Sequence, residues 1–437
     1  MKIEKQATSE HVVSSKVLFP FILITSLFAL WGFANDITNP MVAAFGSVME
    51  LSTAHASLVQ FAFYGGYATM AIPAALFIQK YSYKSGILLG LGLYALGALL
   101  FFPAAQFQMF GFFLLSLYIL TFGLAFLETT ANPYILAMGS VETSTRRLNL
   151  AQAFNPIGSL MGMFVASQFI LANLQSDKIT VDEYGVDSFS ALDTVTKEAI
   201  RLEDLMVIRN PYVILGLVVI CMFVIIAITK MPKILDLENR PGFRESVKAL
   251  FANKTYIRGV VAQIFYVGAQ IMCWTYIIHY AGRLGIDKAD AQMYNIFAMG
   301  MFLVGRFIAT ALMKFVNSRL MLAGFGCGAI VCTLGAIFID GMAGLYSLMA
   351  VSIFMSLMFP TIYGIALEGI GRYATLGAAG LVMAIVGGAL MPPMQGWIID
   401  QGTVMGLPSE NASFVLPLIC FIVVTWFGYR SYRAITK

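Results

Sequence analysis

LETTANPY, residues 127–134, lies midway along an apolar stretch that runs from Met109 to Met138. A helix of this length crosses the roughly 30 Å of hydrocarbon in a bilayer. The carboxylate of Glu128 costs roughly 2.5–3.5 kcal/mol to insert at that depth, so it requires a partner, a proton or a water-filled cavity. A buried acid that exchanges protons in a many-helix membrane protein indicates proton-coupled transport. A structural carboxylate paired with a helix donor is the alternative.

The composition is that of a polytopic helical membrane protein. Of the 437 residues, 59% are hydrophobic and 11% are charged, whereas soluble domains carry about 25% charged residues. The net charge is +4 and the basic residues are spread over loops, so nucleic acid is not an expected partner. The five cysteines lie in apolar runs without metal-ligand spacing. We expect them to be small packing residues, and we expect no metal and no cofactor.

Apolar runs separated by short polar breaks predict an all-α protein with twelve transmembrane helices. The first run should stay in the protein, because residues 1–16 are mostly polar and the run lacks a small-residue cleavage site. The predicted spans lie near residues 18–48, 56–79, 85–105, 109–138, 148–172, 211–230, 257–282, 291–313, 319–339, 343–368, 373–398 and 412–432.

The loop charges predict the orientation. Lys and Arg gather in the breaks after even-numbered spans, whereas the longest of the opposite loops, residues 173–208, is acidic. The positive-inside rule then places both termini in the cytoplasm. Residues 230–256 are predicted to be a cytoplasmic connector with a surface helix, between an amino-terminal six-helix bundle (1–229) and a carboxy-terminal one (257–437).

The two predicted bundles resemble each other in sequence. Segments 66–101 and 300–338 align without gaps, with Lys80 opposite Lys314. Each of these two lysines falls at the turn between the second and third spans of its half. Two pseudo-symmetric six-helix halves with cytoplasmic termini are typical of a major facilitator transporter, whose site lies at the midplane between the halves.

Polar residues interrupt the first predicted span. Asn35, Asp36 and Asn39 have the i, i+1, i+4 spacing that places them on one helical face. Such a stripe should face a cavity or another helix. The alternative is that the span ends near residue 35 and that these residues form its exit loop.

Amides follow one face of the fifth predicted span. Asn149, Gln152 and Asn155 are spaced i, i+3, i+6. An amide both donates and accepts hydrogen bonds, which suits the vicinal hydroxyls of a sugar. Amides also join helices to one another by hydrogen bonds, so helix packing remains an alternative.

The seventh predicted span carries a second polar and aromatic face. Gln263, Tyr266 and Gln270 fall at i, i+3, i+7, and Trp274 continues the face. Aromatic rings stack on the apolar faces of sugars while amides bind the hydroxyls. Packing or contact with lipid is the alternative for the aromatic residues.

The remaining ionisable residues do not form a catalytic cluster. The three histidines, His11, His55 and His279, are scattered, so we expect no enzyme activity. Glu368 and Arg372, one turn apart near the end of the tenth span, are predicted to form a gate or structural ion pair.

Taken together, four segments resemble the fucose–proton symporters, a sugar-transporting branch of the major facilitator superfamily, over nearly the whole chain. The resemblance implies that Glu128 is the inner acidic residue linked to proton coupling and sugar, and that Gln152 and Asn155 line the sugar cavity. The segments are 62–67 (AFYGGY), 127–133 (LETTANP), 147–155 (RLNLAQAFN) and 266–274 (YVGAQIMCW).

The first helix departs from the family pattern. The family carries a second carboxylate there, and that position falls on Asn39, whereas this chain has Asp36 one turn earlier. Either Asp36 takes over the role, or Glu128 acts alone, or the coupling ion differs. Other members use sodium or carry glucose, galactose or N-acetylhexosamines.

The sequence therefore predicts a symporter that imports L-fucose or a related hexose with a cation, most simply H⁺, with Na⁺ as an alternative. It is predicted to be a monomer in the bacterial inner membrane. A sodium-coupled sugar carrier, or a facilitator or drug exporter of the same fold, is the alternative function. The predicted proton-coupling residues are Glu128 and Asp36, and the predicted sugar-binding residues are Asn35, Asn39, Glu128, Gln152, Asn155, Tyr266, Gln270 and Trp274.

Overall fold

The computed structural model describes residues 17–138, 151–152, 154–178, 189, 191–232, 242–313 and 315–435. Within these residues, 11 helical segments are long and apolar enough to cross a membrane. A twelfth helix, α14 (Lys288–Leu312), lies where the eighth span is predicted. It is less apolar because Asp290, Asn295 and Arg306 interrupt it. The predicted all-α membrane fold is confirmed.

The amino half, residues 18–228, contains the first six predicted spans. Several spans consist of two consecutive helices joined by a tight turn, as where α1 ends two residues before Pro40, which cannot donate a helix hydrogen bond. The helices of this half are α1 (Leu18–Thr38), α2 (Met41–Val48), α3 (Thr53–Ala56), α4 (Leu58–Lys80), α5 (Tyr83–Leu99), α6 (Phe101–Phe107), α7 (Phe110–Ala137), α9 (Phe154–Val165), the π-helix η2 (Ala166–Ile170), the 3-10 helix η3 (Leu171–Asn173) and α10 (Thr194–Ile228).

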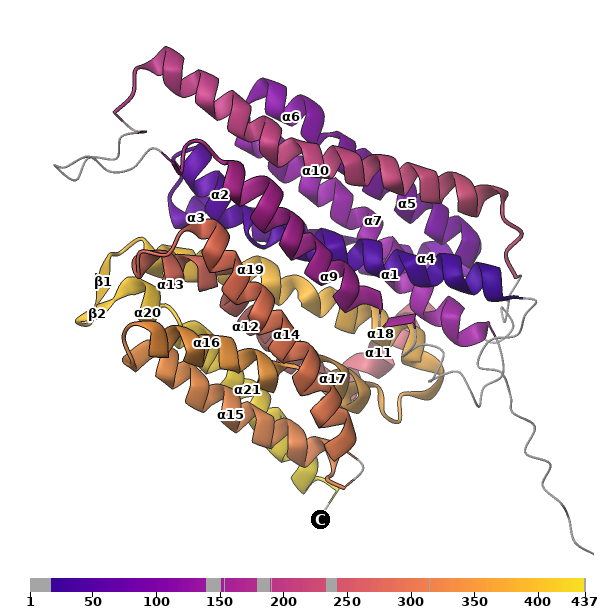
Figure 1. Cartoon of the computed structure of the whole chain (residues 1–437). Helices are drawn as coiled ribbons and strands as arrows, with labels where there is room; N and C mark the ends of the chain where they lie inside the picture. Colours follow the sequence, from indigo (N-terminus) through magenta and orange to yellow (C-terminus); the bar gives the residue numbers. More distant parts are fainter. Residues whose placement is uncertain are drawn as a thin grey trace, which may run out of the picture.

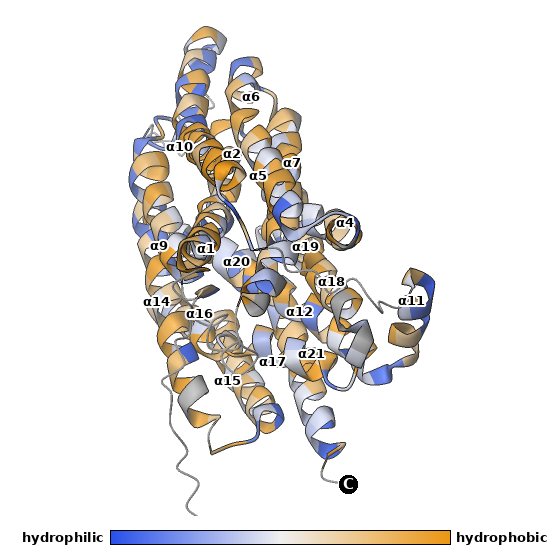
Figure 2. Ribbon diagram, turned by 90° about the vertical axis from the view of Figure 1, so that its right-hand side faces the viewer, coloured by the Kyte–Doolittle hydropathy of each residue, from blue (hydrophilic) through white to orange (hydrophobic). Residues whose placement is uncertain are grey.

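The carboxyl half, residues 254–433, contains the other six spans. It follows α11 (Phe243–Ala252), a short helix within the predicted connector, along which Figure 2 shows both hydrophilic and hydrophobic residues. The carboxyl half comprises α12 (Lys254–Thr275), α13 (Ile277–Arg283), α14, α15 (Ser318–Phe338), α16 (Met342–Met355), α17 (Met358–Leu367), η4 (Gly371–Tyr373), α18 (Ala374–Met383), η5 (Ala384–Val386), α19 (Gly387–Ile399), the antiparallel strands β1 (Thr403–Val404) and β2 (Leu407–Pro408), α20 (Ser409–Ala412) and α21 (Val415–Arg433).

Helix α10 is longer than the predicted sixth span. The side chain of Asp193 caps its start by accepting a hydrogen bond from the backbone N–H of Thr196 at 3.1 Å, and the bonds from Thr196 lower the pKa of the Asp193 carboxyl. The acidic segment 173–208 is therefore helical from Thr194 onward, not a loop throughout. The predicted span at 211–230 covers only the apolar part of α10, because the first turns of this helix are polar.

The two halves repeat the same helix pairings. In the amino half, α1 packs against α9, and α5 packs against α7 and α10. In the carboxyl half, α12 packs against α19, and α15 packs against α16 and α21. These pairs occupy corresponding spans, so the fold consists of two pseudo-symmetric bundles, as predicted. The domain boundaries at residues 229 and 257 stay predictions.

Glycine allows the closest of these helix pairs to form. A Cβ atom at Gly158 of α9 would overlap the carbonyl of Ala29 on α1. In the same way, a Cβ atom at Gly387 of α19 would overlap the carbonyl of Ile264 on α12. The two corresponding helix pairs therefore use the same device for close backbone approach.

The halves lie side by side (Figure 1). Helix α4 contacts α18, η5 and α19, while α9 contacts α14. We call the end of the molecule that carries α2, α3, β1, β2 and α20 the hairpin end, and the opposite end, near α11 and the carboxyl end of α21, the α11 end (Figure 1).

Much of the exposed surface of the bundle is apolar. Helices such as α9 and α14 turn large hydrophobic side chains outward, and Figure 2 shows hydrophobic residues along them. An exterior of this kind is suited to lipid rather than to water. Examples are Ile157, Met161 and Phe164 on α9, and Phe297, Val304 and Phe307 on α14.

Candidate functional site between the two halves

The polar residues of the first span lie inside a helix. Helix α1 continues through Asn35 and Asp36 to Thr38, and the apolar pattern resumes in α2. The alternative that these residues form an exit loop is therefore wrong. Asp36 is 5% exposed and Asn39 is 1% exposed, so both are withdrawn from solvent.

Asp36 and Asn39 form a hydrogen-bonded pair at the end of α1. The Nδ2 of Asn39 donates to Oδ1 of Asp36 at 2.9 Å. The Oδ1 of Asn39 accepts from Nε2 of Gln60 at 3.3 Å and from the hydroxyl of Tyr64 at 3.4 Å, and both of these residues lie on α4. Ser159 of α9 is also within hydrogen-bonding reach of Asp36. Asn39 and Ser159 thus hold the acid directly, and α4 is linked to it only through Asn39.

Glu128 lies on α7 in a different setting. The residue is 8% exposed, and its Oε2 is buried without a hydrogen-bond partner among the described residues. The ion pairs formed within the described part of the chain do not include it. Tyr67 of α4 and Tyr363 of α17 are close enough to interact with it electrostatically. Glu128 therefore lies near residues of both halves, and the alternative of a structural ion pair finds no support among these residues.

The amides of the fifth span divide between two roles. Gln152 is exposed, and its Nε2 donates to Oδ1 of Asn132 at 3.2 Å. The Nδ2 of Asn132 in turn donates to the backbone carbonyl of Glu128 at 3.1 Å. Gln152 is therefore connected to the turn that follows the buried acid. Asn149 lies outside the described residues.

Asn155 joins two helices. Its Nδ2 donates to the carbonyl of Phe28 on α1 at 3.3 Å. The nitrogen of this amide therefore plays the part described by the alternative, in which amides join helices to one another. One of the two N–H groups of the Asn155 amide is therefore used between helices.

The carboxyl half contributes the polar face of α12. The indole Nε1 of Trp274 donates to Oγ of Ser352 at 3.1 Å, and the hydroxyl of Tyr266 donates to the carbonyl of Met355 at 3.1 Å. Their donor groups are therefore used within their own half. Gln270 is half-buried, whereas Gln263 is fully buried with both amide atoms unpartnered among the described residues.

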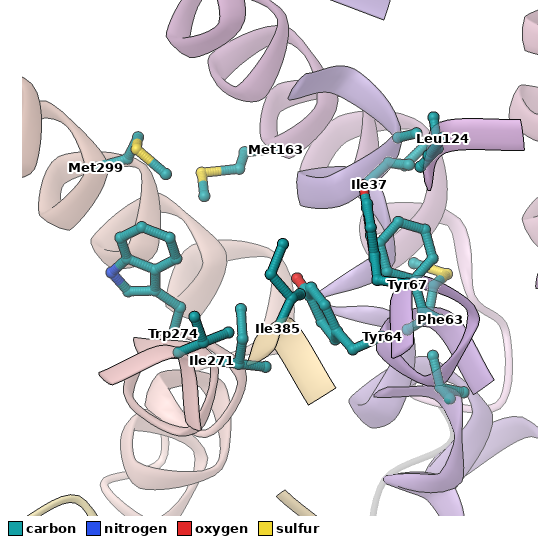
Figure 3. Packing of buried hydrophobic residues seen from close by; sticks show 14 of the residues in the cluster. Ile37, Phe63, Tyr64, Tyr67, Leu124, Met163, Ile271, Trp274, Met299 and Ile385 are labelled. Carbon is teal, nitrogen blue, oxygen red and sulfur yellow. The ribbon is translucent and has the colours of Figure 1, made fainter. Parts of the chain in front are cut away.

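Aromatic and aliphatic side chains of the two halves pack together around these polar groups. Figure 3 shows Tyr64 beside Ile385 of η5, with Trp274 and Ile271 on the side of the carboxyl half. The ring of Trp274 meets Phe302 edge-on, with centroids 5.3 Å apart. Polar groups and apolar side chains of both halves are thus buried in the same region, and this mixture of residues is typical of a small-molecule site.

Two residues of the site were not predicted. Gln60 is fully buried, and its Nε2 donates to Oγ1 of Thr275 at 2.9 Å, across the two halves. Gln60 precedes the AFYGGY segment (62–67) in an otherwise apolar run, so an isolated polar residue was the available signal. Thr275 has no comparable signal, because its partner lies 215 positions away.

The predicted pair of Glu368 and Arg372 stays a prediction, and Glu368 has a partner that was not predicted. Glu368 forms its ion pair with Arg319, at the start of α15. The side chain of Arg372 lies outside the described part of the chain. Sequence spacing favours a local partner, but Glu368 follows the end of α17, where the chain turns and another helix comes within reach.

Comparison with known proteins places this site in a family context. A family model described as Major Facilitator Superfamily matches residues 21–392. The chain is 61% identical over 423 residues to the L-fucose-proton symporter of Haemophilus influenzae, a match that covers 97% of this chain and 98% of that protein. It is 34% identical over 430 residues to the L-fucose-proton symporter of Escherichia coli, covering 96% of this chain and 95% of that protein.

The solved structure of the E. coli fucose:proton symporter agrees with these matches. It superimposes with a TM-score of 0.71 at 32% identity, covering 95% of this chain and 98% of that chain. The relatives are transporters and not enzymes, in accord with the predicted absence of a catalytic cluster.

Because Oε2 of Glu128 has no hydrogen-bond partner within the described part of the chain, the effect of replacing this residue on stability can be predicted. Glu128→Gln removes a charge without removing a partner, so the thermal midpoint in detergent should stay the same or rise. Asp204→Asn is the matched control, because Asp204 is fully buried and accepts from the backbone N–H groups of Gln175 at 2.7 Å and Ser176 at 2.9 Å. That variant should lose about 1–3 kcal/mol. A lower midpoint for Glu128→Gln would contradict the unpaired carboxylate.

Proposed function

Because this chain belongs to the major facilitator superfamily, we propose that it is a secondary symporter that imports L-fucose, or a closely related hexose, together with a proton by alternating access. The observation that carries the proposal is the buried Glu128 carboxylate near both halves, with one oxygen unpartnered among the described residues. The similarity to two proteins named L-fucose-proton symporter supports the choice of sugar and ion.

Protonation of Glu128 is the proposed coupling step. An ionised carboxylate resists enclosure in a low-dielectric interface, whereas the neutral acid is much less costly to bury. Proton binding therefore favours the state in which the halves enclose Glu128 and the sugar. After the halves rock to the other side, water reaches the acid again, and both proton and sugar leave.

Asp36 is proposed as the second acid of the coupling pathway. The family's first-helix carboxylate position falls on Asn39, and the hydrogen bond between Asn39 and Asp36 brings the substitute acid into contact with that position. The short i, i+3 separation along α1 supports this exchange of roles. No resident cofactor takes part in the proposal, because the transported proton is itself the coupling ion.

The sugar is proposed to bind between the amide groups of both halves. Asn35 and Asn39 on α1, with Gln152 and Asn155 of the fifth span, offer donors and acceptors to vicinal hydroxyls. Gln270 does the same from α12. Since the polar atoms of Trp274 and Tyr266 already bind Ser352 and Met355, these two residues are proposed to offer their ring faces.

The charge distribution supports an orientation with the α11 end in the cytoplasm. Helix α11, at that end, carries the basic residues Arg244 and Lys248, while α10 begins at the opposite end with the acidic cap residue Asp193. Both termini are then cytoplasmic. The proposed location is the bacterial inner membrane, where an inward proton gradient drives uptake, and the proposed working unit is a monomer.

A sodium-coupled glucose or galactose carrier is the alternative that Asn39 favours, since an amide occupies the position of the family's second carboxylate. The amide-rich site does not favour a drug exporter of the same fold, whose cavity would be larger and richer in aromatic residues. Uptake of labelled sugars into vesicles under an imposed pH gradient or an imposed sodium gradient separates these alternatives.

We predict that Glu128→Gln abolishes accumulation of L-fucose driven by a pH gradient but retains exchange of labelled for unlabelled L-fucose. The neutral amide mimics the protonated acid, so the loaded protein still rocks while net coupling is lost. The measurement is uptake and counterflow in the same proteoliposomes. Accumulation at the wild-type level in the variant would end the proposal for Glu128.

We predict that Trp274→Ala and Gln270→Ala each weaken L-fucose binding, by about 1 kcal/mol for a lost stacking or hydrogen-bonding contact. Titration calorimetry of the purified protein measures the affinity. Trp426→Ala is the matched control, because Trp426 is 49% exposed on α21. Unchanged affinity in a site variant would remove that residue from the sugar site.

A further inference from the structure

A chain of hydrogen bonds leads from the first-helix acid to the other half of the protein. We propose that Gln60 is a positioning residue that couples the Asp36–Asn39 pair to α12 through Thr275, so that a ligand which disturbs this pair loosens the contact between the halves at the hairpin end. The inference deepens the proposed function, because it rests on sugar binding at Asn39.

The direction of each bond in the chain is set by the one before it. An ionised carboxylate only accepts, so Asn39 must turn its Nδ2 toward Asp36. The Oδ1 of Asn39 then faces away and accepts from Nε2 of Gln60 at 3.3 Å. That nitrogen carries two hydrogens, and it also donates to Oγ1 of Thr275 at 2.9 Å. The acid thereby determines the orientation of both amides.

Burial protects these hydrogen bonds from competition with water. Gln60 is 0% exposed, and Asn39 and Thr275 are each 1% exposed, so water does not compete for them. The Oε1 of Gln60 has no hydrogen-bond partner among the described residues. Gln60 is therefore held through its donor nitrogen, which also lies 3.5 Å from the backbone carbonyl of Asn39. Loss of the Thr275 hydroxyl removes the bond from this nitrogen to the other half and leaves its bonds to Asn39.

The bond to Thr275 belongs to a set that closes the hairpin end. The carboxylate of Asp400, at the end of α19, accepts from the backbone N–H groups of Thr53 at 2.8 Å and Ala54 at 2.9 Å on α3. Ser167 of η2 donates to the carbonyl of Ala289 on α14 at 3.1 Å. Lys288 likewise reaches from α14 to the amino half.

These bonds must break together when the halves separate at that end. Among those named here, the bond between Gln60 and Thr275 is the one that continues to a carboxylate of the proposed site. A sugar hydroxyl that bonds to the amide of Asn39 competes with both Asp36 and Gln60 for the same atoms. Sugar binding is thereby communicated to the closure of the hairpin end.

The test compares Thr275→Val, which is isosteric but lacks the hydroxyl, with Thr275→Ser, which keeps it. The readout is the rate at which a membrane-impermeant maleimide labels an Ala54→Cys variant of the full chain in proteoliposomes, corrected for labelling of the parent protein. Loss of one buried hydrogen bond should raise the rate about two- to tenfold in Thr275→Val and leave Thr275→Ser near the wild-type rate.

Two further variants separate coupling from a general structural effect. Gln60→Met should raise labelling like Thr275→Val, and the double variant should add nothing further, because both changes remove the same bond between the halves, that of Gln60 to Thr275. Thr333→Val is the matched control: Thr333 is fully buried, but its hydroxyl bonds to Ala329 of its own helix at 2.7 Å, so its rate should not change. If Thr275→Val does not fold, Gln60→Met replaces it in the comparison.

The response to sugar completes the test. Saturating L-fucose should raise the labelling rate of the Ala54→Cys protein with Thr275 intact, because the contact at the hairpin end is loosened. The rise should be smaller in Thr275→Val. Wild-type labelling in Thr275→Val, additive effects in the double variant, or an equal rise in Thr333→Val would each overturn the inference. Labelling without sugar needs no transport, so failure of the proposed function would appear separately, as absent L-fucose uptake with the sugar-free labelling pattern intact.

Discussion

The Glu128 carboxylate lies on α7 near residues of both halves, and one of its oxygens is buried without a hydrogen-bond partner among the described residues. A charge in such a position is stable only if it binds a proton, gains a partner or meets water. Movement of two bundles about this group supplies these conditions in turn. In the mechanism we propose, the need to satisfy this acid in two environments links the architecture of the protein to the coupling of sugar and proton.

Asp36 is also a buried acid, but unlike Oε2 of Glu128 its carboxylate accepts a hydrogen bond within the described residues. It is bonded to Asn39, which in turn contacts α4, and through Gln60 the network crosses to α12. A bonded acid is better suited to holding the site in one geometry, while an acid with a free oxygen is better suited to exchanging a proton. In the proposed mechanism the two carboxylates therefore have different roles: Asp36 holds the site and Glu128 exchanges the proton.

The spans and the site stripes could be predicted because hydrophobic length and helical spacing are local properties. Glu128, Asp36 and Asn39 stood out as polar residues in apolar runs, and the continuation of α1 through Asp36 was predicted from the apolar pattern that resumes in α2. The start of α10 was missed, because its first turns are polar and depend on a cap at Asp193.

Contacts between distant segments could not be predicted from local patterns. Thr275 is an ordinary small residue until α12 is placed against α4, and Glu368 has a nearby basic residue in sequence but pairs with Arg319 from another helix. Asn155 appeared as a sugar ligand, yet its nitrogen is used to join the fifth span to α1. Residue type and spacing indicate which groups are available, whereas packing decides which atoms remain free for a ligand.

The most direct test of this account is the proton movement that accompanies sugar entry. Purified protein in liposomes loaded with a pH-sensitive dye, with no gradient imposed beforehand, would be mixed with L-fucose. The account predicts acidification of the lumen in step with sugar uptake for the wild type, and sugar equilibration without acidification for Glu128→Gln. Equal acidification in both proteins would contradict the central role of the Glu128 carboxylate.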